Sequence, residues 1–539
     1  MTAGLAKTIE VLTATGNEAA VDVLLPALDS PHRGIQELAL KALLDRWSEL
    51  GQREIVRHWH VFDERLKDLV AERPGRIHDA LRAAILGADA KDFANACDAV
   101  LWVKEYDLLP ALLTAAEDLS NPLGEEAAHT MLALADLLYE ELASPRDYRV
   151  RRDPQLTRQH VLGSLEASAS RYDQHHRVAA LDAFLILASR ENATLKRILL
   201  NPHDRSFLPL IDVLTTSSHP GVMRLLLAYL DDPHAPHAAL NALARRSDEA
   251  FLRHLLKKLG AELQPGVKAN LRRIESIAWL REDMRRLLQL SEGEQQAVMH
   301  LAAASGIKRS QVFEVVQFLL RHGNVGGRRA ASQYLAEFKG VDANLIAIQA
   351  LDDHDPQVQV NILLQLRERG IPSAMTRLLE LVDSPHAVVR QAAQQCLAEF
   401  SFKRYLAAFD MLDAEMRRTT GALVRKVDPE ALPQLAEELQ ATGRTRRLRA
   451  LQIATCLGAT ADLEPQLIEL LTDEDHFVRI EAAQLLVACD SSNTRVALRS
   501  AMLDRHVGVQ QAAERSLRRL TQQPVPSGAI SGAATEDHP

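Results

Sequence analysis

Apolar residues in the second half of the sequence follow a helical pattern that repeats about every 30 positions. With Val389 as position zero, small or apolar residues follow at +3, +4, +7 and +8, which is the spacing of one face of an α-helix. Unrelated amphipathic helices have no reason to keep a constant spacing, so this pattern predicts an array of structural repeats. The pattern starts again, in steps of 29 to 31 residues, at Gly327, Val358, Thr419, Arg449, Val478 and Val509.

Each repeat also contains an earlier helix, for example at 374–383, 463–473 and 496–504, that ends in a short turn. Asp or Ser in such a turn can cap the free N–H groups of the following helix, and Pro cannot extend the preceding helix. One repeat is therefore a helix, a tight turn and a second helix. A single pair cannot bury its apolar faces alone, so we expect the pairs to stack into a continuous core.

The turns and the helices that follow them resemble HEAT repeats. In that family a turn of the form D-x-x-P-x-V-R precedes paired Ala residues and a Leu, and the matching residues here are Asp383, Pro385, Val389, Arg390, Ala392, Ala393 and Leu397. The period of about 30 residues is most similar to the short HEAT-like repeats of phycobilisome lyases and related bacterial proteins. The resemblance is firm over 325–520 and weaker over 20–50 and 205–324. It implies an all-α fold, a right-handed α-solenoid of stacked antiparallel helix pairs, as in HEAT and armadillo superhelices.

Spacing and composition divide the chain into five segments. Residues 1–143 predict helices of irregular period, and residues 144–200 predict a basic loop followed by further helices. Residues 201–324 predict degenerate HEAT-like repeats, and residues 325–520 predict the regular ones. Residues 521–539 are rich in Pro, Gly, Ala and Ser, a composition that predicts a disordered tail.

The charge of the chain is unevenly distributed. The net charge is −9, and residues 92–145 contain eleven acidic residues and one basic residue. This acidic stretch would attract a basic partner. Residues 245–286 instead carry an excess of bases. The low aromatic content of 4% fits a thin core built from Ala, Leu and Val layers.

The densest cationic loop follows the acidic stretch directly. Guanidinium groups beside an aromatic ring suit contacts with phosphate, nucleic acid or carboxylate groups. Neutralisation of the neighbouring acidic stretch within the chain is the simpler account. The candidate partner-binding residues of this loop are Tyr148, Arg149, Arg151 and Arg152.

A second candidate binding site lies at Arg328 and Arg329, which follow a glycine-rich stretch at 323–327. Backbone N–H groups at a helix N-terminus and two guanidinium groups could bind an anion there. The same glycines lie at the turn of a repeat, where a tight bend is needed in any case.

The position after zero carries a polar column of Arg and Gln. In HEAT-like solenoids the matching Arg commonly pairs with a turn Asp of an adjacent repeat, here Asp353, Asp383, Asp473 or Asp504. Such an ion-pair ladder would set the register of the repeats, and each exposed pair would contribute about 0–1 kcal/mol. A polar ridge that contacts a partner is the alternative. The column contains Arg328, Gln359, Arg390, Arg479 and Gln510.

The sequence favours a cytoplasmic protein. No stretch approaches the ~18–20 apolar residues that span a bilayer, and the first residues lack the apolar core of a signal peptide. We therefore expect no membrane segment and reduced thiols. The cysteines, which show no C-x-x-C spacing, are Cys97, Cys396, Cys456 and Cys489.

No residue is assigned to catalysis, to a cofactor or to a metal. The sequence contains no P-loop and no nucleophile-elbow motif. Several His residues lie in the turns, but equivalent turns of stacked helices are about 10 Å apart, which predicts that His residues of successive repeats cannot share a metal ion. A row of imidazoles that responds to pH remains open.

These observations predict a non-catalytic HEAT-repeat scaffold or adaptor that binds protein partners. One alternative is an accessory subunit of a bilin-lyase-like enzyme, which the resemblance implies without any matching catalytic residue. Another is a nucleic-acid-binding protein similar to the HEAT-like alkylpurine glycosylases. The basic residues of 245–286 favour this alternative, whereas the net charge of −9 argues against it.

Overall fold

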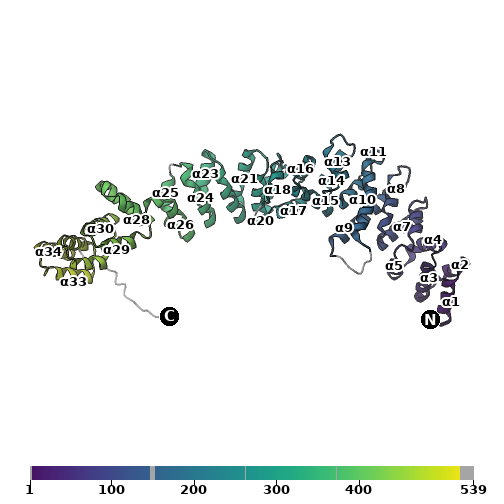
Figure 1. Cartoon of the computed structure of the whole chain (residues 1–539), viewed down its shortest axis with the longest axis horizontal. Helices are drawn as coiled ribbons and strands as arrows, with labels where there is room; N and C mark the ends of the chain where they lie inside the picture. The colour runs from purple at the N-terminus through teal and green to yellow at the C-terminus, as the bar shows by residue number, and fades with distance from the viewer. Residues whose placement is uncertain (1–2, 146–151, 261–262, 372, 523–539) are drawn as a thin grey trace, which may run out of the picture. The chain divides into compact units, whose positions relative to one another are not determined.

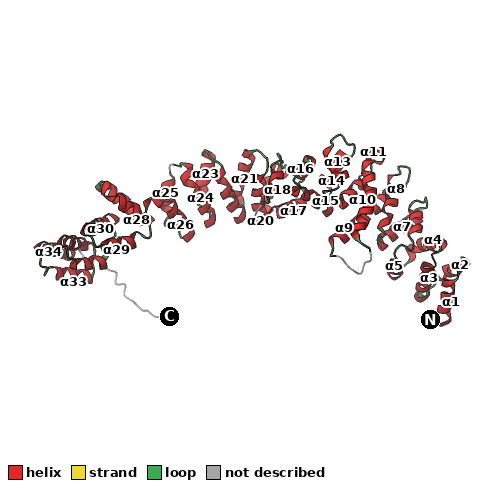
Figure 2. Cartoon of the chain, viewed as in Figure 1, coloured by secondary structure: helices red, strands yellow, loops and turns green. Residues whose placement is uncertain are grey.

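Helices joined by short turns make up the part of the chain that the structure describes (Figures 1 and 2), and no strand occurs there. The computed structural model describes residues 3–145, 152–260, 263–371 and 373–522. The predicted all-α fold of stacked helix pairs is confirmed. The chain divides into two compact units, Met1–Ala331 and Ser332–Pro539, which we call the N-terminal unit and the C-terminal unit. The five segments drawn from the sequence stay a prediction.

The N-terminal unit is built from short helices. Its α-helices are α1 (Ala3–Ala14), α2 (Ala19–Leu28), α3 (Arg33–Arg46), α4 (Glu49–His58), α5 (Glu64–Ala71), α6 (His78–Ile85), α7 (Ala90–Val103), α8 (Leu109–Glu117), α9 (Gly124–Ala143), α10 (Pro154–Ser170), α11 (Tyr172–His175), α12 (Val178–Leu187), α13 (Ala193–Leu200), α14 (Phe207–Thr216), α15 (Pro220–Ala228), α16 (His237–Arg245), α17 (Glu249–Leu259), α18 (Pro265–Leu271), α19 (Ala278–Glu282), α20 (Glu292–Ala304) and α21 (Arg309–His322). The long helix α9 packs against α8 and α12, and α12 also packs against α10 and α15. The helix α22 (Val325–Tyr334) crosses the boundary between the units.

The C-terminal unit contains the regular repeats. Its α-helices are α23 (Val341–Ala350), α24 (Pro356–Arg369), α25 (Ala374–Leu381), α26 (Ala387–Cys396), α27 (Phe402–Ala408), α28 (Ala414–Val427), α29 (Ala431–Leu439), α30 (Arg444–Leu457), α31 (Glu464–Glu469), α32 (His476–Leu485), α33 (Ser492–Ala501) and α34 (Val507–Gln522). Short 3₁₀ helices along the chain are η1 (Trp59–Val61), η2 (Tyr106–Leu108), η3 (Tyr229–Asp231), η4 (Met284–Gln289), η5 (Leu335–Glu337), η6 (Ala398–Phe400), η7 (Phe409–Met411), η8 (Leu470–Thr472) and η9 (Leu486–Ala488). The second helices α28, α30, α32 and α34 pack side by side, and α29 and α33 pack on α30 and α34.

The predicted apolar columns form the core of these repeats. Most residues at +4 and +8 are inaccessible to solvent, while Leu423 and Leu517 are half-buried. Small Ala side chains at these positions let neighbouring helices approach closely, and Leu and Ile fill the space between them. The fully buried members are Ala331, Leu335, Ile362, Leu366, Ala393, Leu397, Ile453, Leu457, Ala482, Leu486 and Ala513.

The predicted register is shifted in two of the repeats. In α28 the side chain that donates to carbonyl groups of the preceding turn is Arg417, so position zero is Met416 and not Thr419. In α30 the residue that makes the same turn contacts as Arg479 is Arg447, so position zero is Arg446 and not Arg449. Residues three positions apart lie on the same face of a helix. A shift of three residues therefore leaves the apolar columns intact and escapes detection in the sequence.

Polar side chains from one repeat hold the helix ends of another. Short helices leave many carbonyl groups without a partner inside the helix. Arg246, which is 1% exposed, donates hydrogen bonds to the carbonyl oxygens of Leu214 (3.1 Å) and Ser217 (2.8 Å). The buried side chain of Asn270 likewise donates to the carbonyl oxygen of Asp232 (2.7 Å). Each bond joins residues about one repeat apart in the sequence.

In the C-terminal unit the residue after position zero caps its own turn and pairs with the next turn. Arg479 donates to the carbonyl oxygens of Asp473 (2.8 Å) and Glu474 (3.2 Å), and its Nε lies 2.9 Å from the carboxylate of Asp504. Arg447 makes the same pair with Asp473 one repeat earlier, at 2.7 Å. The predicted ladder is therefore present at these turns. The side chains of Arg479 and Asp504 are only 4% and 13% exposed, so the energy expected of exposed pairs does not apply.

Asp504 makes the stability of the C-terminal unit depend on pH. Burial alone would raise the pKa of Asp504, but the hydrogen bond from Arg479, the N–H of His506 and the charge of Arg479 lower this pKa below its ordinary value. A carboxyl group with a lowered folded-state pKa stabilises the fold above the unfolded value of about 3.9, and this contribution is lost as the pH falls through the folded value. We therefore expect the amides of 473–510 to lose protection from hydrogen exchange below about pH 4.

The matched variant for this prediction is Asp504→Asn, which cannot ionise. Hydrogen exchange on the full chain at about pH 7 and about pH 3 gives the change in protection for both proteins. The variant should start from lower protection at the higher pH and lose less on acidification. An equal loss in both proteins would show that Asp504 does not contribute.

Candidate functional site

The predicted cationic loop is anchored at Arg152, which lies just before α10. Its Nη1 donates to the carbonyl oxygen of Lys104 (2.8 Å), and its Nη2 lies 3.4 Å from the carboxylate of Glu105. The guanidinium group also lies 5.4 Å from the ring centre of Tyr106. Glu105 is only 5% exposed, and a buried carboxylate needs such a counter-charge. The other predicted residues of the loop lie outside the described residues: Tyr148, Arg149 and Arg151.

Most acidic side chains of 92–145 contact a basic group, and most of these groups come from outside the stretch. The ion pairs found there are Asp92–Arg57, Asp98–Lys67, Glu105–Arg152, Glu117–Arg171, Glu125–Arg177 and Glu141–Lys104. The acidic stretch is thus largely neutralised within the fold, which is the simpler of the two accounts given by the sequence. A basic partner would meet only the carboxylates that remain.

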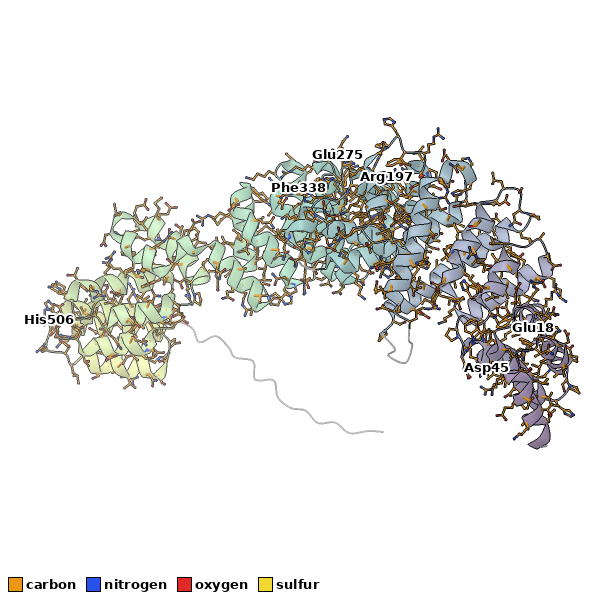
Figure 3. All side chains as sticks on the ribbon, turned by 45° about the vertical axis from the view of Figure 1, so that its right-hand side comes forward. Glu18, Asp45, Arg197, Glu275, Phe338 and His506 are labelled. Atoms are coloured by element: carbon orange, nitrogen blue, oxygen red, sulfur yellow. The ribbon has the colours of Figure 1, made fainter. Side chains whose placement is uncertain are left out.

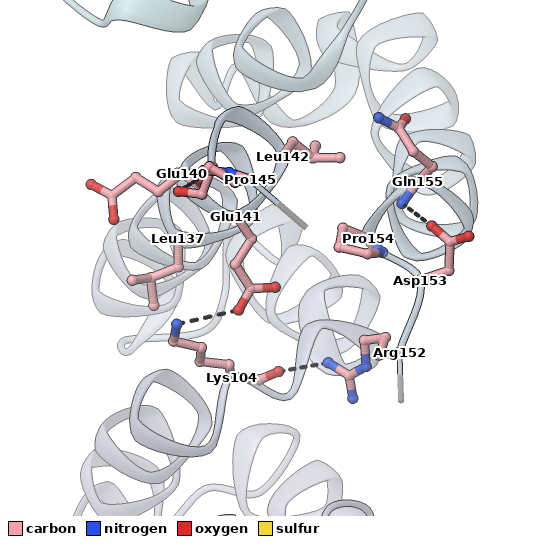
Figure 4. Close-up of a pocket in the computed structure, with 11 residues that line it drawn as sticks. Lys104, Leu137, Glu140, Glu141, Leu142, Pro145, Arg152, Asp153, Pro154 and Gln155 are labelled. Carbon is pink, nitrogen blue, oxygen red and sulfur yellow. Dashed lines mark hydrogen bonds and ion pairs between the residues drawn. The ribbon is translucent and has the colours of Figure 1, made fainter. Parts of the chain in front are cut away.

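A pocket of about 380 Å³ opens beside Arg152, between the ends of α7 and α9 and the start of α10 (Figure 4). At its rim the ammonium group of Lys104 lies 3.2 Å from the carboxylate of Glu141. Glu140, next to Glu141 in the last turn of α9, also lines the pocket. Charged and polar residues make up most of the lining, and convergent polar groups beside apolar side chains are common in binding sites. The apolar walls are Leu137, Leu142, Pro145 and Pro154.

Helix ends position the groups of this pocket. Lys104 ends α7 with a φ of 57°, in the left-handed region, and this turn presents its carbonyl group to Arg152. Asp153 caps α10 by accepting a hydrogen bond from the N–H of Gln155 (2.9 Å). A left-handed conformation in a residue with a side chain costs free energy and is concentrated at functional sites.

The glycines before Arg328 serve helix packing. A side chain at Gly326 would meet the carbonyl oxygen of Glu292 at 2.7 Å, so the start of α22 packs directly on the start of α20. The N–H of Gly327 donates to the side chain of Asn324 (3.0 Å), and Arg328 donates to the carbonyl oxygen of Gly323 (2.9 Å). The chain's own groups thus occupy this helix N-terminus. Arg329 lies exposed on α22.

Two turn histidines of successive repeats stack on each other in the C-terminal unit. The ring centres of His476 and His506 (His506 is labelled in Figure 3) are 4.1 Å apart, with 30° between the planes. The distance argument was wrong for this pair, because the side chains bridge the gap between the turns. The rings meet face to face, so their nitrogens do not converge on one point. No group of three or more potential metal ligands occurs among the described residues.

The N-terminal unit contains a cluster of side chains of the kinds that hydrolases use: Ser168, His175 and Glu117. Ser168 Oγ and Glu117 Oε1 lie 3.3 and 3.6 Å from the same nitrogen, Nε2 of His175. The other nitrogen, Nδ1, accepts a hydrogen bond from the N–H of Arg177 (3.0 Å), so in the neutral ring Nε2 carries the proton. A ring in this state cannot take a proton from Ser168. The cluster joins α8, α10 and α11.

None of the described helices is long and apolar enough to cross a bilayer. Burial raises the pKa of the Cys97 thiol to about 11, so the thiolate is scarce at neutral pH. Burial also raises the pKa values of Cys396 and Cys489.

Residues 312–398 match the family of HEAT repeats. This match confirms the HEAT-type character of the repeats in that range, whereas the finer similarity to phycobilisome lyases stays a prediction. No curated protein matches the chain.

Several solved structures are similar to the chain. One is Kap121p, which is 11% identical, with 96% of this chain and 72% of that chain covered and a TM-score of 0.20. Another is Kap121p bound to Ste12p, at 13% identity, 96% and 64% coverage and a TM-score of 0.21. An engineered protein matches at 17% identity, 94% and 99% coverage and a TM-score of 0.17. The chain spans 53% of the length of a Kap121p mutant that it also matches.

Proposed function

We propose that this protein is a scaffold that binds other proteins and catalyses no reaction itself. Stacked helix pairs expose a large surface for their mass, and such surfaces commonly bind polypeptides. The HEAT-type repeats at 312–398 support the proposal. The observation that carries it is a repeated exposure of apolar side chains in the C-terminal unit.

These side chains lie in the first turns of the second helices. Met416 in α28, Phe477 in α32 and Val507 in α34 are 55%, 45% and 61% exposed. Because α28, α30, α32 and α34 pack side by side and ion pairs join successive turns, their first turns lie along one edge of the unit, which we call the turn edge. The helix dipole favours Asp or Glu in a first turn, so apolar residues there give the helices no advantage. Exposed apolar surface of this kind marks interaction sites.

Planar groups fill the turn edge between these apolar residues. The guanidinium group of Arg444, at the start of α30, lies 4.7 Å from the ring centre of Phe477 and 3.4 Å from the carboxylate of Asp475. Phe477 in turn lies 4.1 Å from the ring centre of His476. Aromatic and Arg side chains on a rigid element are the residues that most often dominate protein interfaces.

Glutamate at Phe477 and Val507 tests the proposal. We expect a protein that co-purifies stoichiometrically with the wild-type chain from the native cell. The affinity of the double variant for this protein should fall by about tenfold or more, because charge at an interface centre typically costs over 1.4 kcal/mol. The matched control is Gln484→Glu with Gln511→Glu, which places the same charges at exposed positions further along α32 and α34. Retention of the partner by the first variant, or absence of any stoichiometric partner of the wild type, would contradict the proposal.

A further inference from the structure

The longest helix of the N-terminal unit, α9, ends in acidic residues, although the helix dipole favours basic residues at this end. The C-terminus of a helix carries partial negative charge and favours a basic side chain in the last turn. The last turn of the 20-residue helix α9 instead contains Glu140 and Glu141 and no basic residue. Ser144 donates twice to the carbonyl group of Glu140, through its N–H (3.0 Å) and its hydroxyl group (2.8 Å).

Two cations that the structure describes near this helix end are already engaged. Lys104 pairs with Glu141 at 3.2 Å, and Arg152 pairs with the buried Glu105. No described residue forms an ion pair with the carboxylate of Glu140, which is exposed. Among the described residues, the rim of the pocket of Figure 4 therefore keeps the negative charge of Glu140 and of the end of α9, directly beside apolar walls.

We infer that this pocket binds a lysine or arginine side chain of a partner polypeptide. The aliphatic stem would lie along Leu137, Leu142 and Pro154, as long basic side chains do on apolar surfaces. The charged head would face Glu140 and the carbonyl end of α9, where carbonyl groups accept charge-assisted hydrogen bonds. An uncharged side chain would leave this helix end without a counter-charge. The inference rests on the proposed scaffold function and specifies the chemistry of one partner residue.

Two small probes of matched shape test the inference on the full chain. N-acetyl-lysine amide carries the stem and the charge, and N-acetyl-norleucine amide carries the stem alone. Titration with the lysine probe should shift the methyl NMR signals of Leu137 and Leu142, and the norleucine probe should bind several-fold more weakly. Glu140→Gln should weaken the lysine probe by about two- to fivefold. Glu126→Gln, an exposed residue in the first turn of α9, is the control and should leave binding unchanged.

Equal affinity for both probes, or unchanged affinity in the Glu140→Gln variant, would overturn the inference. Binding of the lysine probe only after Arg149 and Arg151 are replaced by serine would also overturn it, because the chain's own arginines would then be the occupants. These results are independent of the turn-edge variants. If the lysine probe does not bind, but the variant with Phe477→Glu and Val507→Glu loses its partner protein, this inference is wrong and the proposed scaffold function is retained.

Discussion

Replacement of Arg246 by alanine is expected to lower the free energy of unfolding of the N-terminal unit by about 2–5 kcal/mol, because a fully buried side chain that satisfies backbone carbonyl groups is removed. The side chain is 1% exposed, and it donates to Leu214, to Ser217 and, at 2.8 Å, to the carboxylate of Asp248. Its guanidinium group also lies 4.7 Å from the ring centre of Phe251. The alanine variant would leave two buried carbonyl groups without donors and a cavity beside this ring.

Intrinsic tryptophan fluorescence in a urea titration measures this loss of stability in the N-terminal unit. All four tryptophans belong to the N-terminal unit, and the one at 279 lies in α19, which packs against α16 just before Arg246. The control is Arg245→Ala, a neighbouring exposed arginine, which should change stability by no more than about 0.5 kcal/mol. Arg246→Lys should fall between the two, since one ammonium group cannot reach three acceptors. Similar urea midpoints for the two alanine variants would contradict the assignment.

The fold class could be predicted because it depends on local pattern. The period of about 30 residues and the +4 and +8 columns are set by side chains within one helix, and burial follows directly from them. The register of α30 could not be predicted. Arg446 and Arg449 lie on one helical face, and only the hydrogen bonds of Arg447 to its turn distinguish them. The backbone acceptors of Arg246 lie about 30 residues away, and no sequence spacing identifies them.

The candidate site could be predicted only in part. Arg152 was expected either to bind a partner or to neutralise the acidic stretch, and the structure shows it paired with Glu105. The pocket beside it is formed by segments about 50 residues apart, at Lys104 and at 152–155, so the sequence does not reveal it. One local clue was present, because Glu140 and Glu141 end a long apolar-patterned helix that should favour bases. The turn edge was missed for a different reason, since an apolar residue in a first turn reads as core until its exposure is known.

The ion-pair ladder of the C-terminal unit is the second place where a large effect is expected. Exposed pairs contribute about 0–1 kcal/mol, which was the expectation for this column. The Arg479–Asp504 pair is buried, so Arg479→Met or Asp504→Asn alone should cost about 3–5 kcal/mol by leaving the other charge unpaired. Arg479 also caps the carbonyl groups of Asp473 and Glu474, and for this reason its loss should exceed that of Asp504.

A double-mutant cycle isolates the pair itself. Combining Arg479→Met with Asp504→Asn removes both charges, so the double variant should be destabilised by less than the sum of the single ones, with a coupling energy of about 2 kcal/mol or more. Hydrogen exchange of the amides of α32 and α34 measures it, because the C-terminal unit contains no tryptophan. The control cycle is the exposed pair Arg518–Glu514 within α34, which should couple by about 0.3–0.5 kcal/mol. Equal coupling in the two cycles would mean that burial does not strengthen the ladder, and the register of the repeats would then rest on the apolar columns alone.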